Sequence, residues 1–454
     1  MAIKSINPYN QQVLKEFDAL SVANIHEKLS TAQTRFTAWQ KTSFEERARL
    51  MEKAADVMES KKAHYASLMT QEMGKLSSEA LAEVEKCAWC CRYYATHAAD
   101  FLKDELIETD ASKSYLHYEP LGVILAIMPW NFPFWQVIRF AAPTLMAGNV
   151  GVLKHASNVP QCALALEEIF IEAGFPEGVF QTLLMNTSDV EEVIKHPAVK
   201  AVTLTGSEGA GASVAALAGK YLKKTVLELG GSDPFIILED VDVAHVAKMA
   251  VKGRMINAGQ SCIAAKRFIV VKSVAEAFIE AFKEEMGKLQ LGDPTQEATT
   301  LACMARKDLT DELLEQVQQS IDLGATTILG GKKAKEGEAF FEPTILTNLQ
   351  QGMPAYDQEL FGPVASVIVV EDAEEAIAVA NASPYGLGGS IWSKNIEKAE
   401  ALAHRVASGA VFINGIVKSD PRLPFGGVKL SGYGRELSYL GIREFVNIQT
   451  IWVG

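Results

Sequence analysis

Cys262 is the residue of this chain whose setting best suits covalent chemistry. It closes the segment 257–262, directly after a helix-length stretch from Val243 to Ile256. Gly259 permits a tight backbone turn there, and a thiol just past such a turn can project into a cleft. A free cysteine is more often a small buried hydrophobe, and its reactivity depends on surroundings that favour the thiolate. A catalytic role therefore needs confirming residues elsewhere in the chain.

Two upstream residues could supply the other groups that such a thiol needs. Glu228 closes an apolar strand, where it is either a solvated strand end or a partly desolvated carboxylate that activates water. Asn131 lies between Pro129 and Pro133, which brace a rigid turn. Its amide could donate to an oxyanion, although asparagine in a proline turn is usually just turn chemistry. Together with Cys262 they make a nucleophile, a base and an electrophilic stabiliser.

With these residues in view, the chain resembles the aldehyde dehydrogenase superfamily nearly end to end. Five ordered and widely separated motifs carry the resemblance, at residues 129–133, 227–231, 259–262, 359–364 and 424–429. Three narrower segments, at residues 154–156, 229–235 and 435–438, look like those of bacterial succinate-semialdehyde dehydrogenases of the Sad type. The resemblance implies NAD(P)-dependent oxidation of succinate semialdehyde to succinate. The alternative is a broad-specificity aldehyde dehydrogenase for other aliphatic or semialdehyde substrates.

The resemblance also implies a role for each catalytic residue. Cys262 would attack the aldehyde carbon to give a thiohemiacetal and then a thioester, while the Asn131 amide stabilises the oxyanion. Glu228 would activate the water that hydrolyses the thioester, with Glu436 as a candidate second proton relay. Relatives that acylate coenzyme A generally lack this base, so a free carboxylic acid is the expected product. A thiol hydrolase would instead need a histidine base, and none of the eight histidines lies in a recognisable partner motif.

A glycine-rich segment at residues 206–211 is the first sign of a nicotinamide cofactor, NAD or NADP. It follows an apolar strand and opens a helix, a setting suited to phosphate binding. Its spacing differs from the usual dinucleotide fingerprint, and by itself such a turn is more often merely a turn. The resemblance implies that Gly206, Ser207 and Gly211 form the cofactor turn.

The resemblance implies further cofactor contacts. Lys154 would bind the adenosine ribose, although a solvated strand terminus is its simpler interpretation. Glu359 and Phe361 would hold the nicotinamide ribose and ring, and Trp130 would lie beside them or else be a core aromatic. Ser157 stands where many NAD-preferring relatives carry a glutamate. Its small hydroxyl leaves room for a 2′-phosphate, so NADP should be accepted.

Arg139 is the expected ligand of the substrate's distal carboxylate. It falls where semialdehyde dehydrogenases hold that group, and a guanidinium matches a carboxylate bidentately. A surface or interdomain ion pair is the alternative. A second arginine found six residues before the cysteine in some relatives is replaced here by Ile256. Arg254, Ser419 and Arg422 are candidates to take its place, and a wider aldehyde range that includes glutarate semialdehyde stays open.

Length and composition narrow the class of protein. With 454 residues, the chain should form about two or three structural units. A net charge of −13 without a lysine or arginine cluster argues against a nucleic-acid surface. The N-terminus lacks the apolar core of a signal peptide, and no run approaches a membrane helix, so we expect a cytoplasmic protein with no membrane contact. Six cysteines, three of them within residues 87–91, predict neither a disulfide framework nor a metal site.

Alternating strands and helices predict an α/β fold with largely parallel sheets. The first hundred residues are expected to be helical, with helices from Ser43 to Ser60 and from Ser77 to Leu102. Strands are then expected at residues 122–127, 151–154, 201–204, 225–228, 235–238, 267–271, 364–370 and 388–392. Helices are expected at residues 161–174, 209–220, 274–289, 308–323 and 373–380.

The resemblance divides the chain into three parts. A Rossmann-type cofactor domain would comprise residues 1–110 and 123–230, and an α/β catalytic domain residues 231–430. Residues 111–122 and 431–454 would form a small β arm for oligomerisation. Within them, the stretches 112–118 and 445–452 look like exposed strands, which invite pairing with another subunit. A homodimer or homotetramer is therefore expected.

Overall fold

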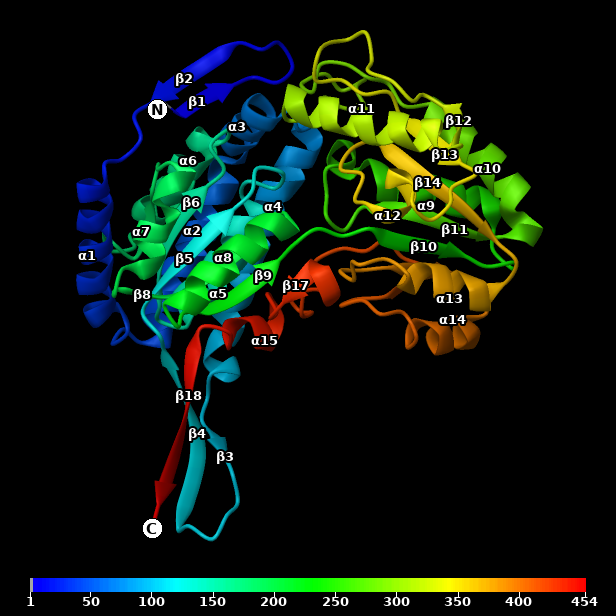
Figure 1. Cartoon of the computed structure of the whole chain (residues 1–454). Coiled ribbons are helices and arrows are strands. Elements are labelled where there is room, and N and C mark those ends of the chain that lie inside the picture. Colours follow the sequence, from blue (N-terminus) through cyan, green and yellow to red (C-terminus); the bar gives the residue numbers. More distant parts are fainter. Residues whose placement is uncertain (1–2) are drawn as a thin grey trace.

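The computed structural model, which describes residues 3–454, contains two large α/β units and a projecting β ribbon (Figure 1). The chain crosses from the first unit to the second between residues 228 and 233. The predicted α/β class with largely parallel sheets is confirmed. In the part of the chain that the structure describes, no helix combines the length and apolar character needed to cross a bilayer.

A six-stranded sheet is the centre of the first unit. Its strand order is β17-β9-β8-β5-β6-β7, and only the edge strand β17 runs antiparallel to its neighbour. All residues of β6 are buried, as expected for a parallel sheet covered on both faces. The strands are β5 (Val123–Met128), β6 (Val150–His155), β7 (Phe180–Thr182), β8 (Val199–Thr205), β9 (Lys224–Glu228) and β17 (Gly432–Tyr433).

Eight helices belong to this first unit, among the residues described. Ser43 caps α2 by accepting a hydrogen bond from the Glu46 amide, so the predicted helix start is confirmed. The helices are α1 (Val22–Trp39), α2 (Phe44–Ser60), α3 (Lys62–Met73), α4 (Ser77–Phe101), α5 (Trp135–Met146), α6 (Pro160–Glu172), α7 (Val190–Lys195) and α8 (Glu208–Lys220).

A seven-stranded sheet is the centre of the second unit. Its order is β12-β13-β14-β11-β10-β15-β16, parallel except between β12 and β13. The strands are β10 (Asp233–Ile237), β11 (Ala265–Val271), β12 (Thr326–Leu329), β13 (Thr344–Thr347), β14 (Val364–Val370), β15 (Ser390–Trp392) and β16 (Phe412–Ile413). The helices are α9 (Val243–Met255), α10 (Lys272–Gly287), α11 (Lys307–Asp322), α12 (Pro354–Asp357), α13 (Ala373–Asn381) and α14 (Ile396–Ala403).

The projecting ribbon joins segments from distant parts of the chain (Figure 1). Strand β18 (Val446–Val453) pairs along its whole length with β4 (Lys113–Pro120), and β3 (Glu105–Leu106) lies on the other side of β4. The short helix α15 (Ser438–Ile442) precedes β18. Ile448 and Trp452 of β18 are more than half exposed. The outer edge of β18 thus offers unpaired backbone groups and apolar side chains.

The expectation that the first hundred residues are all helical is wrong. A hairpin of β1 (Ile3–Ile6) and β2 (Val13–Phe17) precedes α1. Each strand is too short for its alternation to stand out from a loop, and the hairpin gains its stability by packing: β1 buries alternate residues against α3 and α6. The short strands β7, β12, β13 and β16 were not expected either, for the same reason.

Candidate active site

The site lies where the carboxyl ends of parallel strands meet. Strand β5 ends at Met128 and leads into the 129–133 turn, and β8 ends at Thr205 before the 206–211 turn. Strand β9 ends at Glu228, directly before the crossing to the second unit. Because these strands are neighbours and parallel, their ends lie along one edge of the sheet, which is where open α/β sheets bind ligands.

The loop that presents Cys262 has an unusual backbone. Asn257, Ala258 and Gly259 follow α9 with φ values of 54°, 53° and 76°. A Cβ at residue 259 would lie 2.2 Å from the carbonyl oxygen of Gly362, so only glycine fits. The Asn257 amide donates to the backbone oxygen of Asn131 at 2.8 Å, which ties this loop to the proline turn.

Arg254 stabilises the loop that presents Cys262. Its guanidinium is fully buried and donates to the carbonyl oxygens of Ala265 at 2.9 Å and Gly259 at 2.8 Å. It also donates to Leu360 at 3.1 Å. Arg254 is therefore a positioning residue, and the idea that it binds the substrate carboxylate is wrong.

Arg422 is equally unsuited to bind the substrate carboxylate, since its exposed side chain pairs with Asp420 at 2.7 Å.

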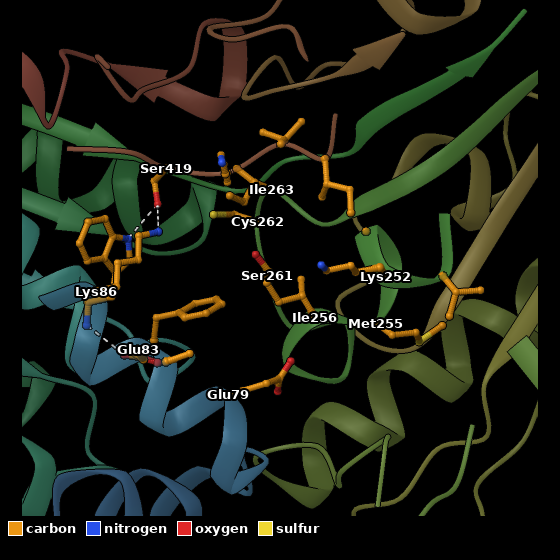
Figure 2. Close-up of a pocket in the computed structure, with 18 of the residues that line it drawn as sticks. Glu79, Glu83, Lys86, Lys252, Met255, Ile256, Ser261, Cys262, Ile263 and Ser419 are labelled. Atoms are coloured by element: carbon orange, nitrogen blue, oxygen red, sulfur yellow. Dashed lines mark hydrogen bonds between the residues drawn. The ribbon is translucent and has the colours of Figure 1, made fainter. Parts of the chain in front are cut away.

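Cys262 lies between two cavities. One has a volume of about 690 Å³ and the other about 570 Å³, and Cys262 and Gln136 line both. Figure 2 shows the larger cavity, with Cys262 and Ser261 on its wall. Two spaces that meet at one thiol suit a reaction between an aldehyde entering from one side and a cofactor entering from the other.

Burial controls the ionisation of the thiol. It raises the pKa of Cys262 to about 12, while Arg139 and Lys266 oppose the rise. The thiol is therefore protonated at neutral pH in the ligand-free protein, and attack on an aldehyde requires transfer of this proton to a base.

Glu228 and Glu436 form a pair of buried carboxyl groups. Their side chains are almost inaccessible, and neither oxygen of Glu228 has a hydrogen-bond partner in residues 3–454. Burial raises the pKa of Glu228 well above its ordinary range, and the nearby Glu436 raises it further, while Arg139 lowers it. Gly426 leaves room for this carboxyl group, because a Cβ there would lie 2.7 Å from Oε1 of Glu228. Neither glutamate is part of the wall of the two cavities.

Asn131 has a fixed amide orientation. Its Nδ2 donates to the carbonyl oxygen of Gln260 at 3.0 Å, and its Oδ1 accepts from Nε2 of Gln136 at 3.0 Å. The second N–H of the same amide remains for a ligand in the smaller cavity, which Asn131 lines with Cys262. His155 braces the turn through a contact of 2.9 Å between its Nε2 and the Pro133 oxygen.

The smaller cavity contains most of the expected cofactor residues. Its wall includes Trp130, Gly206, Ser207, Glu359 and Phe361. The Trp130 and Phe361 rings meet edge to face with centroids 5.9 Å apart. The Ser207 side chain caps α8, whose first N–H groups therefore face the space where a pyrophosphate would lie.

Two contacts shape the rest of this cavity. Glu359 forms an ion pair with Lys266 at 3.1 Å and accepts from the Gly231 amide at 3.1 Å. A Cβ at Gly211 would lie 2.6 Å from Leu229, so glycine allows α8 to approach the end of β9 closely. This donor-rich turn and the aromatic pair fit a dinucleotide.

Lys154 and Ser157 lie outside the cavity wall. Lys154, on β6, is largely buried, and burial lowers the pKa of its ammonium. Ser157 is exposed just beyond the end of the same strand. The interpretation of Lys154 as a solvated strand end is wrong.

The larger cavity contains Arg139 and Ser419. Arg139 is buried, pairs through Nε with Glu436 and donates from Nη2 to the Thr205 hydroxyl at 3.2 Å. It lies 4.7 Å from the centre of the Phe425 ring. Its ion pair is thus inside the site and not on the surface.

Sequence reasoning missed Lys86, which also lines the larger cavity. It comes from α4 and donates to the Ser419 hydroxyl at 2.8 Å (Figure 2). In the sequence, Lys86 was indicated only by its position between Glu83 and Cys87, on the face of the helix that is buried. A charged side chain on a buried face needs a hydrogen-bond partner, but Ser419, the partner of Lys86, is 333 positions away in the sequence.

Comparisons with known proteins agree over the whole chain. The model of the aldehyde dehydrogenase family matches residues 1–451. The chain is 52% identical over 453 residues to a probable succinate-semialdehyde dehydrogenase (NADP(+)) of Synechocystis sp., with 100% of both chains covered. It is 48% identical to the succinate-semialdehyde dehydrogenase (NADP(+)) of Mycolicibacterium paratuberculosis, with 100% of this chain and 97% of that one covered. The NADP+ complex of succinic semialdehyde dehydrogenase from Streptococcus pyogenes superposes with a TM-score of 0.98 at 42% identity, covering 100% of both chains.

Proposed function

Because the chain belongs to the aldehyde dehydrogenase family, we propose that it oxidises succinate semialdehyde to succinate with NADP or NAD as electron acceptor. The observation that carries the proposal is the larger cavity beside Cys262, where Lys86, Arg139 and Ser419 gather hydrogen-bond donors. An aldehyde with a carboxylate at its far end has the complementary charge. The relatives at 48% to 52% identity bear the name of this activity.

The chemistry begins at Cys262. A base accepts the thiol proton, and the sulfur forms a bond to the aldehyde carbon, which gives a thiohemiacetal. The second N–H of Asn131 and the backbone N–H of Cys262 stabilise the oxyanion. Trp130, Glu359 and Phe361 would hold the nicotinamide ring of the cofactor, which would supply the hydride acceptor, and loss of hydride from this carbon would give a thioester.

Hydrolysis completes the turnover. Glu228 in its carboxylate form takes a proton from water as the water attacks the thioester, and the thiol is released with the acid product. Glu436 exchanges protons with Glu228. Burial raises the pKa of Glu436, and its ion pair with Arg139 opposes this rise. Arg139 also turns its remaining N–H groups toward the substrate carboxylate together with Ser419.

The cofactor assignment rests on the smaller cavity and on Ser157. Trp130, Glu359 and Phe361 would hold the nicotinamide end, and the 206–211 turn the pyrophosphate. Lys154 would bind the adenosine ribose at the end of β6. The short, exposed Ser157 beside it leaves space for a 2′-phosphate, so we expect NADP to be used well.

We extend the proposal to the organisation of the chain. Residues 1–110 and 123–230 act as the cofactor domain, residues 231–430 as the catalytic domain, and residues 111–122 and 431–454 as an arm. Across these bounds, β17 completes the sheet of the first unit and β3 joins the ribbon. The exposed outer edge of β18 supports pairing with a second copy in a homodimer or homotetramer. The enzyme would work in the cytoplasm.

A substrate comparison tests this function. Purified protein is given succinate semialdehyde, glutarate semialdehyde or butanal with each cofactor, and formation of the reduced cofactor is followed by its absorbance. We expect the highest kcat/KM for succinate semialdehyde with NADP. A kcat/KM for butanal as high as that for succinate semialdehyde would favour the broad-specificity alternative, and no reduction with any aldehyde would refute an oxidising role.

A further inference from the structure

The larger cavity contains a cluster of donors around Ser419. The hydroxyl oxygen accepts one hydrogen bond from Nζ of Lys86 at 2.8 Å and another from Nε1 of Trp135 at 3.0 Å. A serine oxygen has two lone pairs, so both are used. Its hydroxyl hydrogen has no acceptor among residues 3–454. Ser419 is therefore set to donate.

Lys86 has donors to spare in the same place. Its ammonium carries three N–H groups, and only one contacts Ser419. It lies 4.1 Å from the centre of the Trp135 ring, which fixes the side chain by a cation–π contact. Within the described chain it makes no ion pair.

The nearest carboxylate is already engaged. Glu83 lies one turn before Lys86 on α4 and accepts from the Phe134 and Trp135 amides at 2.9 Å, at the start of α5. It also pairs with the buried Lys75. Glu83 therefore caps α5 and does not neutralise Lys86.

Arg139 offers a further donor beside Lys86 and Ser419. Arg139 uses Nε for Glu436 and Nη2 for Thr205, which leaves Nη1 for a ligand. Lys86 and Ser419 line the cavity next to Cys262 (Figure 2), and Arg139 lines the same cavity. Glu79 and Gln136 offer acceptor oxygens elsewhere in the same cavity, but a ligand group that contacts Ser419, Lys86 and Arg139 meets one hydroxyl donor and two cations. An acceptor with negative charge fits these three partners, and a carboxylate meets both conditions.

We propose that Lys86 is a specificity-determining residue, which binds the distal carboxylate of the semialdehyde together with Ser419 and supplies the second cation that Ile256 cannot supply. This inference rests on the proposed function and adds to it the residue that selects the substrate. Ile256 lines the same cavity with an apolar side chain.

The charge of Lys86 makes the idea testable by pH. Burial and, to a smaller extent, the like charge of Arg139 lower the pKa of Lys86 to about 8. Glu83 and the buried thiols of Cys87 and Cys90 face it from its own helix, and burial raises the pKa of both thiols. The ammonium is charged below about pH 8 and loses its charge above it, so carboxylate binding should weaken as the pH rises through this value.

The experiment compares Lys86→Met and Lys86→Arg with the unchanged enzyme. Kinetics are measured with succinate semialdehyde and with butanal, which has no distal carboxylate. For Lys86→Met we expect the ratio of the two kcat/KM values to fall about 10- to 100-fold, mainly through KM for succinate semialdehyde. Lys86→Arg keeps the charge and should retain most of the preference. Lys103→Met, an exposed lysine just beyond the same helix, is the matched control.

A binding measurement separates charge from structure. Inhibition by succinate is followed across pH for each variant. In the unchanged enzyme its inhibition constant should rise above about pH 8, a rise that Lys86→Arg should shift to higher pH and Lys86→Met should abolish.

The outcomes separate the two proposals. If the unchanged enzyme does not prefer succinate semialdehyde to butanal, the proposed function fails. If it does prefer it and Lys86→Met leaves the ratio and the succinate pH profile as they were, the function stands and the role of Lys86 is refuted. Thermal unfolding of each variant checks that the fold is kept.

Discussion

Glu228, the proposed base, shows at the scale of one residue how a buried carboxyl group lowers stability. Its carboxyl group is buried and forms no hydrogen bond with the part of the chain that the structure describes, and burial raises its pKa well above the ordinary range. Below the ordinary pKa of about 4.3 the group is neutral in both folded and unfolded chains. As the pH rises from there toward the folded pKa, only the unfolded chain ionises, and the folded state loses stability.

Replacing Glu228 by glutamine should therefore stabilise the protein in a pH-dependent way. The variant and the unchanged enzyme should unfold at similar temperatures near about pH 4, and the variant should gain an increasing advantage toward neutral pH. Thermal unfolding measured at several pH values checks this. A constant difference at all pH values would mean that Glu228 does not carry the raised pKa.

Glu228→Gln should stop the reaction after hydride transfer and before hydrolysis of the thioester. Glu228→Gln cannot take a proton from water, but hydride transfer precedes that step. Rapid mixing with saturating substrate and cofactor should give a burst of reduced cofactor close to one per active site, followed by a steady rate lower by about 100-fold or more. A steady rate equal to that of the unchanged enzyme would exclude Glu228 as the base.

At the scale of elements, the close packing of α8 on β9 sets the shape of the cofactor cavity. Gly211 on α8 faces Leu229, where an added Cβ would lie only 2.6 Å away. Gly219, on the exposed side of the same helix, has nothing within 4 Å of an added Cβ. The two glycines form a matched pair within one helix.

Alanine should therefore have opposite effects at these two positions. Gly211→Ala should lower the free energy of unfolding by about 1 to 3 kcal/mol and weaken NADP binding, because the buried Leu229 side chain or α8 must shift to admit the new methyl group. Gly219→Ala should raise the free energy of unfolding by about 0.4 to 1 kcal/mol, because alanine lowers the conformational entropy of the unfolded chain and its Cβ meets no atom in the folded one. Denaturant unfolding and NADP titration test both. Equal effects at the two sites would show that the contact with Leu229 does not limit the packing.

Elements were more predictable from the sequence than contacts between them. Apolar strands and capped helices follow from local patterns, so β5, β9 and α4 lie where the sequence places them. The function of Arg254 could not be predicted in this way, because its carbonyl partners lie in the 257–259 loop, at the start of β11 and at Leu360, 106 positions away. Lys86 was missed for the same reason, since only the folded chain brings α4 next to Ser419.

At the scale of the whole molecule, the net charge of the chain and the lysines around the larger cavity act on an anionic substrate in opposite directions. The chain carries a net charge of −13, which repels an anion at long range. Around the larger cavity, however, lie four exposed lysines, at positions 248, 252, 288 and 418. Only Lys288 among them pairs with carboxylates in the described residues, so the other three keep their charge available.

The salt dependence of kcat/KM shows whether the net charge or the lysines around the cavity govern substrate capture. Raising the ionic strength from about 0.01 M to about 0.15 M shortens the Debye length from about 30 Å to about 8 Å, which screens both effects. If the lysines around the cavity dominate, kcat/KM for succinate semialdehyde should fall several-fold with salt, while that for butanal stays nearly constant. The double variant Lys252→Gln, Lys418→Gln should flatten this salt dependence. A kcat/KM for succinate semialdehyde that rises with salt would show that the net charge of the molecule outweighs the local lysines.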